Sequence, residues 1–157
     1  MTILQAPVEN LWFLDTFVRI RVPHDPDADG LSVLEHRAPY RDSPPLHIHH
    51  TEDELFLIVE GQFRVRVGQE ERAVGPGSVV LAPKGAPHTY RVESPGGGHW
   101  MTVTARGDFE KFVRAVSRPA VQAALPPTHG APPPESAAAL SRAARPFGIE
   151  LVGPPLG

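Results

Sequence analysis

Short alternating segments separated by turn-forming residues constrain the fold of this chain more than any other feature. In residues 16–22 the apolar side chains of Val18, Ile20 and Val22 alternate with arginines, and residues 62–67 repeat the pattern. Period-two alternation predicts strands with one buried face. Many of the chain's 19 prolines and 14 glycines fall between such segments. Many short strands at close spacing predict an all-β sandwich or barrel.

Two further segments are apolar without alternation. Residues 55–59 are apolar at every position, which predicts a strand buried on both faces. Residues 79–82 form a second apolar run, and a Pro–Gly turn at Pro83 and Gly85 follows it. Both segments add strands to the predicted barrel.

The pattern changes after residue 107. Residues 108–116 carry apolar side chains at helical spacing, and Asp108 is the expected N-cap. The five prolines of residues 126–134 predict a linker or a draped loop, and alanine-rich residues 135–145 predict a second helix. Residues 149–156 are expected to form a short tail that docks on the barrel. The apolar face of the first helix consists of Phe109, Phe112, Val113 and Val116.

Composition excludes several classes of protein. The chain has 157 residues and a net charge of -3, so it lacks the basic excess of a nucleic-acid-binding protein. It has neither an apolar run of about 18 residues nor a basic, then apolar, N-terminal signal. We therefore expect one cytoplasmic domain over residues 1–157, with no membrane partner. The chain contains no cysteine, so any metal must bind nitrogen and oxygen ligands.

Three histidines and one glutamate stand at positions that favour a metal site. His47 and His49 are two residues apart, so on a strand both side chains point to the same face. Glu54 opens the apolar strand that follows, and His88 enters a strand after the Pro–Gly turn. Paired imidazoles with a carboxylate suit a transition metal. His50 has the opposite parity and is expected to point away from the site.

These residues form two motifs with characteristic spacing. The motifs are His47-x-His49-x4-Glu54-x6-Gly61 and Gly77-x5-Pro83-x-Gly85-x2-His88. Both resemble the paired motifs of the cupin superfamily. The resemblance implies a double-stranded β-helix, or jelly-roll, barrel over about residues 14–106, with short C-terminal helices and a tail over 107–157. It also implies that His47, His49, Glu54 and His88 ligate one divalent metal. The usual glycine before the first motif is Arg41 here, and the usual asparagine after the second is Val92.

A finer likeness extends over most of the chain. It rests on four segments: residues 11–15, 44–49, 107–112 and 147–156. These segments resemble small single-domain cupins of the quercetin 2,3-dioxygenase-like group. The likeness implies a dioxygenase that uses O2 on a flavonol-like or other enolic small molecule, with Glu54 as general base. Pairing of cupin barrels through edge strands implies a homodimer.

Several alternatives stay open at this point. The metal is Fe, Mn, Ni, Co, Cu or Zn, since affinity order does not choose among them. A cupin isomerase or decarboxylase, or a non-catalytic protein that binds a small molecule or metal, fits the same motifs. Glu52 and Asp53 are expected in a solvated turn. The remaining histidines are expected to be ordinary loop or strand residues, namely His24, His36, His99 and His129.

Overall fold

A computed structural model of the chain describes residues 8–25, 27, 30–127 and 134–157. Within these residues strands are the main regular structure, with two α-helices and a short 3-10 helix. The strands are β1 (Glu9–Phe13), β2 (Thr16–Val22), β3 (Ser32–Ala38), β4 (Leu46–His49), β5 (Glu54–Glu60), β6 (Phe63–Val67), β7 (Glu70–Val74), β8 (Val79–Ala82), β9 (His88–Val92), β10 (Gly98–Thr104), β11 (Arg118–Pro119) and β12 (Ile149–Gly153). The helices are α1 (Asp108–Val116), α2 (Pro134–Ala144) and the 3-10 turn η1 (Arg145–Phe147).

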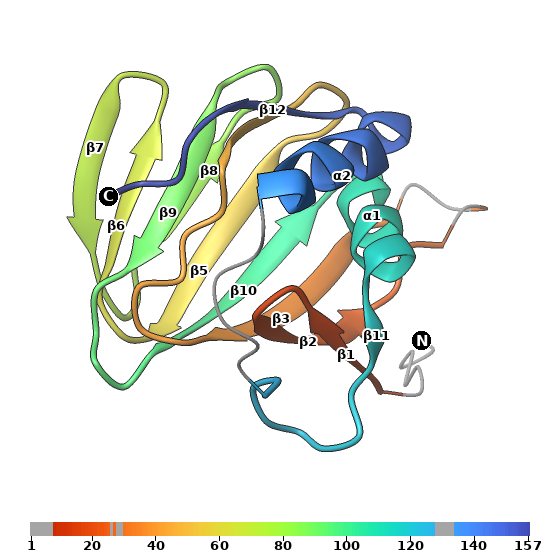
Figure 1. Cartoon of the computed structure of the whole chain (residues 1–157), viewed down its shortest axis with the longest axis horizontal. Coiled ribbons are helices and arrows are strands. Elements are labelled where there is room, and N and C mark those ends of the chain that lie inside the picture. The colour runs from red at the N-terminus through yellow and green to blue at the C-terminus, as the bar shows by residue number, and fades with distance from the viewer. Residues whose placement is uncertain (1–7, 26, 28–29, 128–133) are drawn as a thin grey trace.

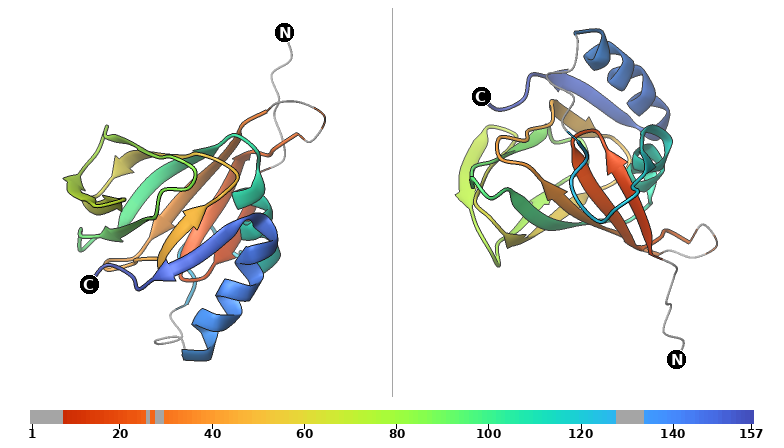
Figure 2. Two further views of the ribbon diagram at one scale, coloured as in Figure 1. Left: turned by 90° about the horizontal axis from the view of Figure 1, so that it is seen from above. Right: turned by 60° about the horizontal axis from the view of Figure 1, so that its bottom comes forward.

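The strands form two antiparallel sheets that curve around a common interior (Figures 1 and 2). One sheet has the order β11-β1-β2-β3-β10-β5-β8, and the other has the order β12-β4-β9-β6-β7. Neighbours in both sheets include strands far apart in the sequence, such as β3 with β10 and β6 with β9. This arrangement confirms the predicted all-β jelly-roll barrel with short C-terminal helices.

Two apolar clusters fill the interior. One contains Phe56, Phe63 and Trp100 and lies inside the barrel. The other joins the first sheet to the C-terminal elements, since it contains Leu34 of β3, Phe112 of α1 and other buried residues. The candidate site lies where these two clusters meet, because its lining draws on both.

The C-terminal helices and β12 cover one end of the barrel (Figure 1). The predicted helix over 108–116 is confirmed as α1, and it buries Phe109 and Phe112. Its N-cap is Gly107 with φ 70°, not Asp108, because the chain enters the helix through the left-handed region that glycine favours. Pairing of β12 with β4 confirms that the tail docks on the barrel.

Two predictions about strand faces are wrong. Val22 is 41% exposed, because a register shift between Ile20 and Val22 interrupts the alternation. Residues 55–59 are not buried on both faces, since Leu57 and Val59 are 38% and 39% exposed. No element of the described chain covers the outer face of β5 and β8.

Some expectations lie partly or wholly outside the described residues. The proline-rich segment 126–134 falls mostly there, and so does His129. Within the described residues, the structure contains no helix of the length and apolar character needed to cross a bilayer.

Candidate metal centre

Two neighbouring strands and one facing strand bring the predicted ligands together. His47 and His49 stand on the same face of β4, and His88 at the start of β9 is the direct cross-strand partner of His47. Glu54 is the first residue of β5 in the other sheet. His50 has the opposite parity, as predicted, and its exposed ring contacts Glu150 at 2.8 Å instead of joining the cluster.

The four predicted side chains form a compact cluster. One ligand atom from each of His47, His49, Glu54 and His88 lies within 4.8 Å of the others. The carboxylate Oε2 of Glu54 is 2.9 Å from His88 Nε2 and 3.4 Å from His49 Nε2. His49, Glu54 and His88 are each no more than 2% exposed. The interior of the barrel therefore holds three imidazoles around one carboxylate.

Backbone carbonyls orient two of the rings. His47 Nδ1 donates to the carbonyl of Pro45 at 2.7 Å, and His88 Nδ1 donates to that of Ala86 at 3.0 Å. A carbonyl only accepts, so each Nδ1 carries the proton. Nε2 of both rings thus faces the cluster as the candidate ligand atom, in the arrangement typical of metal-binding histidines.

The three histidines of the cluster differ in the direction in which their pKa is shifted. Burial, reinforced by the other imidazoles, lowers the pKa of His47 to about 3, and burial also lowers the pKa of His49. Burial acts in the same direction on His88, but the hydrogen bond and charge of Glu54 outweigh it and raise the pKa of His88. Two rings are therefore neutral and ready to ligate at neutral pH.

Glu54 is the anionic member of the cluster. Burial alone would raise the pKa of its carboxyl, but interactions with His49, His88 and His47 lower that pKa to about 2. Ligation of a metal by His88 requires loss of its Nε2 proton, and the positive charge of the bound metal would then replace that of the imidazolium beside the carboxylate.

The donor set fits a divalent transition metal. Imidazole nitrogen and carboxylate oxygen suit first-row metals from Mn to Zn. Nε2 of buried His49 lies 3.4 Å from Glu54 Oε2 and lacks a hydrogen-bond partner among the described residues, as expected of a ligand atom whose partner is a metal ion. Nδ1 of the same ring also lacks a partner there, and a metal ion on Nε2 does not supply one. The cluster can therefore hold one metal ion, and the donor types alone do not identify that metal.

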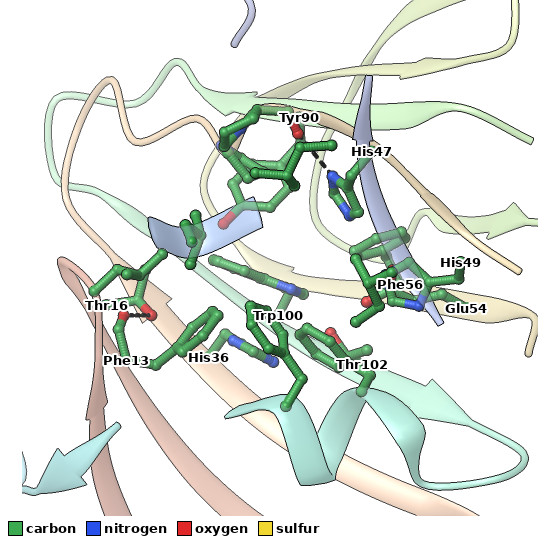
Figure 3. Close-up of a pocket in the computed structure, with 18 residues that line it drawn as sticks. Phe13, Thr16, His36, His47, His49, Glu54, Phe56, Tyr90, Trp100 and Thr102 are labelled. Carbon is green, nitrogen blue, oxygen red and sulfur yellow. Dashed lines mark hydrogen bonds and ion pairs between the residues drawn. The ribbon is translucent and has the colours of Figure 1, made fainter. Parts of the chain in front are cut away.

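An apolar pocket opens from the cluster (Figure 3). His47, His49 and Glu54 lie on one side of it, with Trp100 and His36 on the other. The helices and β12 close it with apolar side chains, namely Phe109, Phe112, Leu140, Ile149 and Leu151. No lysine or arginine is among the described residues that line it.

Glu52 has a role that the sequence reasoning missed. It was expected in a solvated turn, but its side chain is 2% exposed. Its carboxylate accepts the backbone N–H groups of Arg106 at 3.0 Å and Phe109 at 2.6 Å. These donors belong to the loop before α1 and to its first turn, so Glu52 holds the start of α1. Glu52 itself lies two residues before the predicted ligand Glu54. Asp53 remains exposed and accepts the backbone N–H of Lys84.

His36 is a second missed residue. It is 3% exposed, and its ring stacks on Trp100 with centroids 4.9 Å apart. A signal for it exists in the sequence, because Leu34, His36 and Ala38 share one parity within β3. That alternation places an imidazole on the inward face of the barrel.

The two departures from the motif pattern have visible consequences. Arg41 adopts φ 69°, in the left-handed region where glycine is the usual residue. Val92 is fully buried in the barrel, so an apolar side chain fills the place where asparagine is usual. Neither residue belongs to the metal-binding cluster.

Comparisons with known proteins agree with this architecture. Residues 33–104 match the family described as Cupin domain. KdgF from a Halomonas species superposes with a TM-score of 0.53 at 20% identity, covering 61% of this chain and 84% of that one. The cupin domain of Schizosaccharomyces pombe Cnp3 superposes with a TM-score of 0.54 at 12% identity, covering 71% and 77%.

A third similar structure belongs to an enzyme with Mn(II) centres. Bacillus subtilis oxalate decarboxylase superposes with a TM-score of 0.54 at 23% identity. The match covers 64% of this chain but only 28% of that one. No curated protein sequence matches the chain. At these identities the similar structures establish the fold alone.

Proposed function

We propose that this chain, which carries a Cupin domain over residues 33–104, is a metal-dependent dioxygenase acting on an enolic small molecule. The observation that carries the proposal is a cluster of three histidines and one glutamate beside an apolar, aromatic-walled pocket. Both atoms of O2 would enter the substrate. A bound divalent metal would supply a Lewis acid that lowers the pKa of an enolic hydroxyl.

The protein's own groups have defined tasks in this proposal. Glu54 accepts the hydroxyl proton at its carboxylate oxygen, as a general base within the cluster. His47, His49 and His88 hold the metal, with His47 and His88 oriented by backbone carbonyls. Phe56, together with the aromatic side chains of α1, excludes water and orients a planar substrate.

The pocket lining separates this proposal from the decarboxylase and isomerase alternatives. Small carboxylic acids and acidic sugars carry a negative charge that needs a cationic partner when it is buried. A bound metal would pair with one anionic group, but the described lining contains no lysine or arginine for a second anionic group or for one that lies away from the cluster. An apolar wall of this kind favours a neutral or enolic substrate with an aromatic or aliphatic body.

Size adds a second criterion. The pocket encloses about 70 Å³, which is less than the ~150 Å³ of a cavity that admits benzene. A compact enol therefore fits with smaller rearrangement than a flavonol. Binding of any aromatic ring would require the covering side chains of α1, α2 or β12 to shift, by less for a phenol than for a flavonol.

Oxygen uptake by the metal-loaded protein tests the proposal. The protein is loaded in turn with Fe, Mn, Ni, Co, Cu and Zn and supplied with flavonols and with 1,3-dicarbonyl enols. We expect uptake with at least one pair of metal and enol, and stoichiometric substrate loss. Tight binding without uptake would instead support a non-catalytic binding protein.

We also propose that two copies pair through β5 and β8. β8 is the end strand of its sheet. The outer face there is apolar and exposed, formed by Leu57, Val59, Val79 and Leu81. An exposed apolar face beside an unpaired sheet edge favours association. Light scattering should give a dimer that Leu81→Glu dissociates, whereas Val121→Glu, at an 85% exposed position elsewhere, should leave the mass unchanged.

A further inference from the structure

Buried polar atoms without partners gather around the pocket. Within the described residues, eight buried side-chain nitrogen or oxygen atoms have no hydrogen-bond partner, and five of them belong to residues that line the pocket. Two of the five are the ring nitrogens of His49, and a metal ion in the cluster would bond to one of them. The other three are His36 Nε2, Trp100 Nε1 and Thr102 Oγ1.

The strand register places these groups at increasing distance from the cluster. Across β5 and β10, Glu54 faces Thr104, Phe56 faces Thr102, and Ile58 faces Trp100. Four residues along a strand span about 13 Å. Trp100 therefore lies that far along the sheet from the row of Glu54, and His36 faces it from β3. Figure 3 shows His36 and Trp100 across the pocket from His49 and Glu54.

Packing holds the three residues in place without using their polar atoms. The His36 ring lies between Trp100, at 4.9 Å and 8°, and Phe109, at 6.0 Å and 22° between ring planes. The pocket-lining Tyr90 hydroxyl differs, because it donates to Asp42 Oδ2 at 2.8 Å. Buried polar groups are normally paired, and an unpaired one destabilises the fold relative to an apolar residue of the same shape. Three such residues in one wall indicate a ligand that pairs with them.

We propose that His36, Trp100 and Thr102 form a second, polar subsite of the pocket, which hydrogen-bonds an uncharged hydroxyl or carbonyl group of an aromatic ligand. The subsite deepens the proposed function, on which it rests, by naming what the substrate carries at the end away from the metal cluster.

The chemistry of the three groups sets the ligand class. The Trp100 N–H only donates, so it selects an oxygen acceptor, while the Thr102 hydroxyl both donates and accepts. Burial lowers the pKa of His36 to about 4, so its ring is neutral at pH 7 and offers one donor and one acceptor. With no lysine or arginine in the described lining, the subsite favours an uncharged group over a carboxylate.

Two substitutions remove the polar atoms and keep the shapes. His36→Phe retains a ring that stacks on Trp100, and Thr102→Val replaces a hydroxyl by a methyl group. His50→Phe is the matched control, because His50 is exposed and outside the pocket. If the three polar groups serve only the ligand, both pocket variants should keep or raise the Tm, since each removes an unpaired buried group.

The test compares phenol with toluene, two probes of similar size that differ by one hydroxyl, on the metal-loaded full chain by calorimetry. We expect the wild type to bind phenol about three- to tenfold more tightly than toluene, the effect of one neutral hydrogen bond. His36→Phe and Thr102→Val should each reduce this ratio with unchanged metal content. His50→Phe should keep the wild-type ratio.

The other outcomes overturn the subsite. A phenol preference that survives both pocket variants would mean that the hydroxyl is recognised elsewhere, as by the metal. Equal binding of the two probes by the wild type, or binding of neither, would also refute it. If His36→Phe does not fold, the near-isosteric Thr102→Val decides. Oxygen uptake tests the proposed dioxygenase activity independently of the subsite. A phenol preference without oxygen uptake would support the subsite and contradict only the dioxygenase proposal.

Discussion

The two walls of the pocket differ in how their polar atoms are satisfied. The metal wall belongs to the cluster of four predicted ligands, of which three line the pocket, namely His47, His49 and Glu54. His47, Glu54 and the fourth ligand, His88, make hydrogen bonds to one another or to backbone carbonyls, and the unpaired ring of His49 is the exception that a metal ion would bind. In the far wall, formed by His36, Trp100 and Thr102, buried polar atoms have no partner within the described chain. We therefore assign metal binding to the metal wall, and recognition of a polar group on the ligand to the far wall. Variants that affect one wall and spare the other test this division.

The largest expected effect belongs to Glu54 in the metal wall. Glu54→Gln keeps an amide oxygen that can ligate but removes the basic carboxylate. We expect the rate of O2 uptake per bound metal to fall about 10²- to 10⁴-fold, the usual loss when a general base is removed. Rate and metal content are measured on the same samples. A variant that turns over at the wild-type rate per metal would show that Glu54 is a ligand only.

The next effect concerns metal affinity along β4. His47→Ala removes a ring from the cluster, whereas His50→Ala removes an exposed ring one residue beyond His49. We expect the first to weaken metal binding by about 100-fold or more, because even residues that only orient ligands contribute 10- to 100-fold. Elemental analysis after equilibrium dialysis measures both. Equal losses in the two variants would contradict the assignment of faces on β4.

The metal wall could be predicted from the sequence because its spacing is local. His47 and His49 share a face whatever the rest of the chain does, since side chains alternate along a strand. The resemblance of the two motifs to those of cupins then implies Glu54, His88 and the jelly-roll barrel, whereas the short alternating segments alone predict only a sandwich or barrel. Only the meeting of the four side chains required the structure, in which β4, β5 and β9 converge.

The rest of the pocket depends on contacts between distant segments. Glu52 was expected in solvent because nothing near it in sequence shows that the backbone of Arg106 and Phe109 will reach it. His36 lies in an alternating strand, so its inward direction could be inferred, but its stacking on Trp100 and Phe109 depends on how β10 and α1 pack. Residues 55–59 differ from the prediction in the opposite direction. Their apolar sequence predicted burial on both faces, but Leu57 and Val59 on the outer face are exposed in the single chain.

Acid stability should distinguish the far wall from surface histidines. The pKa of His36 is about 4 in the fold and 6.5 ordinarily, so between these values the unfolded chain binds a proton that the folded chain does not. Stability is therefore lost as pH falls from 6.5 to 4. The loss from His36 is about 3 kcal/mol at 1.36 kcal/mol per pH unit.

His36→Phe removes this contribution while leaving the other histidines in place. The difference in unfolding free energy between pH 7 and pH 4, measured by urea denaturation, should shrink by about 3 kcal/mol in the variant relative to the wild type. His50→Phe should change the difference little, since the side chain of His50 is half exposed and pairs with the equally exposed Glu150. An unchanged pH dependence in His36→Phe would mean that His36 is protonated within the fold.

The smallest expected effect concerns the connection between the metal wall and the helix that covers the pocket. Glu52→Ala leaves two backbone N–H groups, of Arg106 and Phe109, without their acceptor, and the bond to Phe109 is buried. The expected cost is about 1–3 kcal/mol of unfolding free energy. Asp53→Ala is the control, because it removes one exposed acceptor from the backbone N–H of Lys84 and should cost under about 1 kcal/mol.

The centroids of the Phe109 and His49 rings lie 5.5 Å apart, so release of α1 should also weaken metal binding in Glu52→Ala but not in Asp53→Ala. If both variants lose equal stability and keep full metal affinity, α1 is held by its apolar face alone, and the two sides of the pocket are energetically independent.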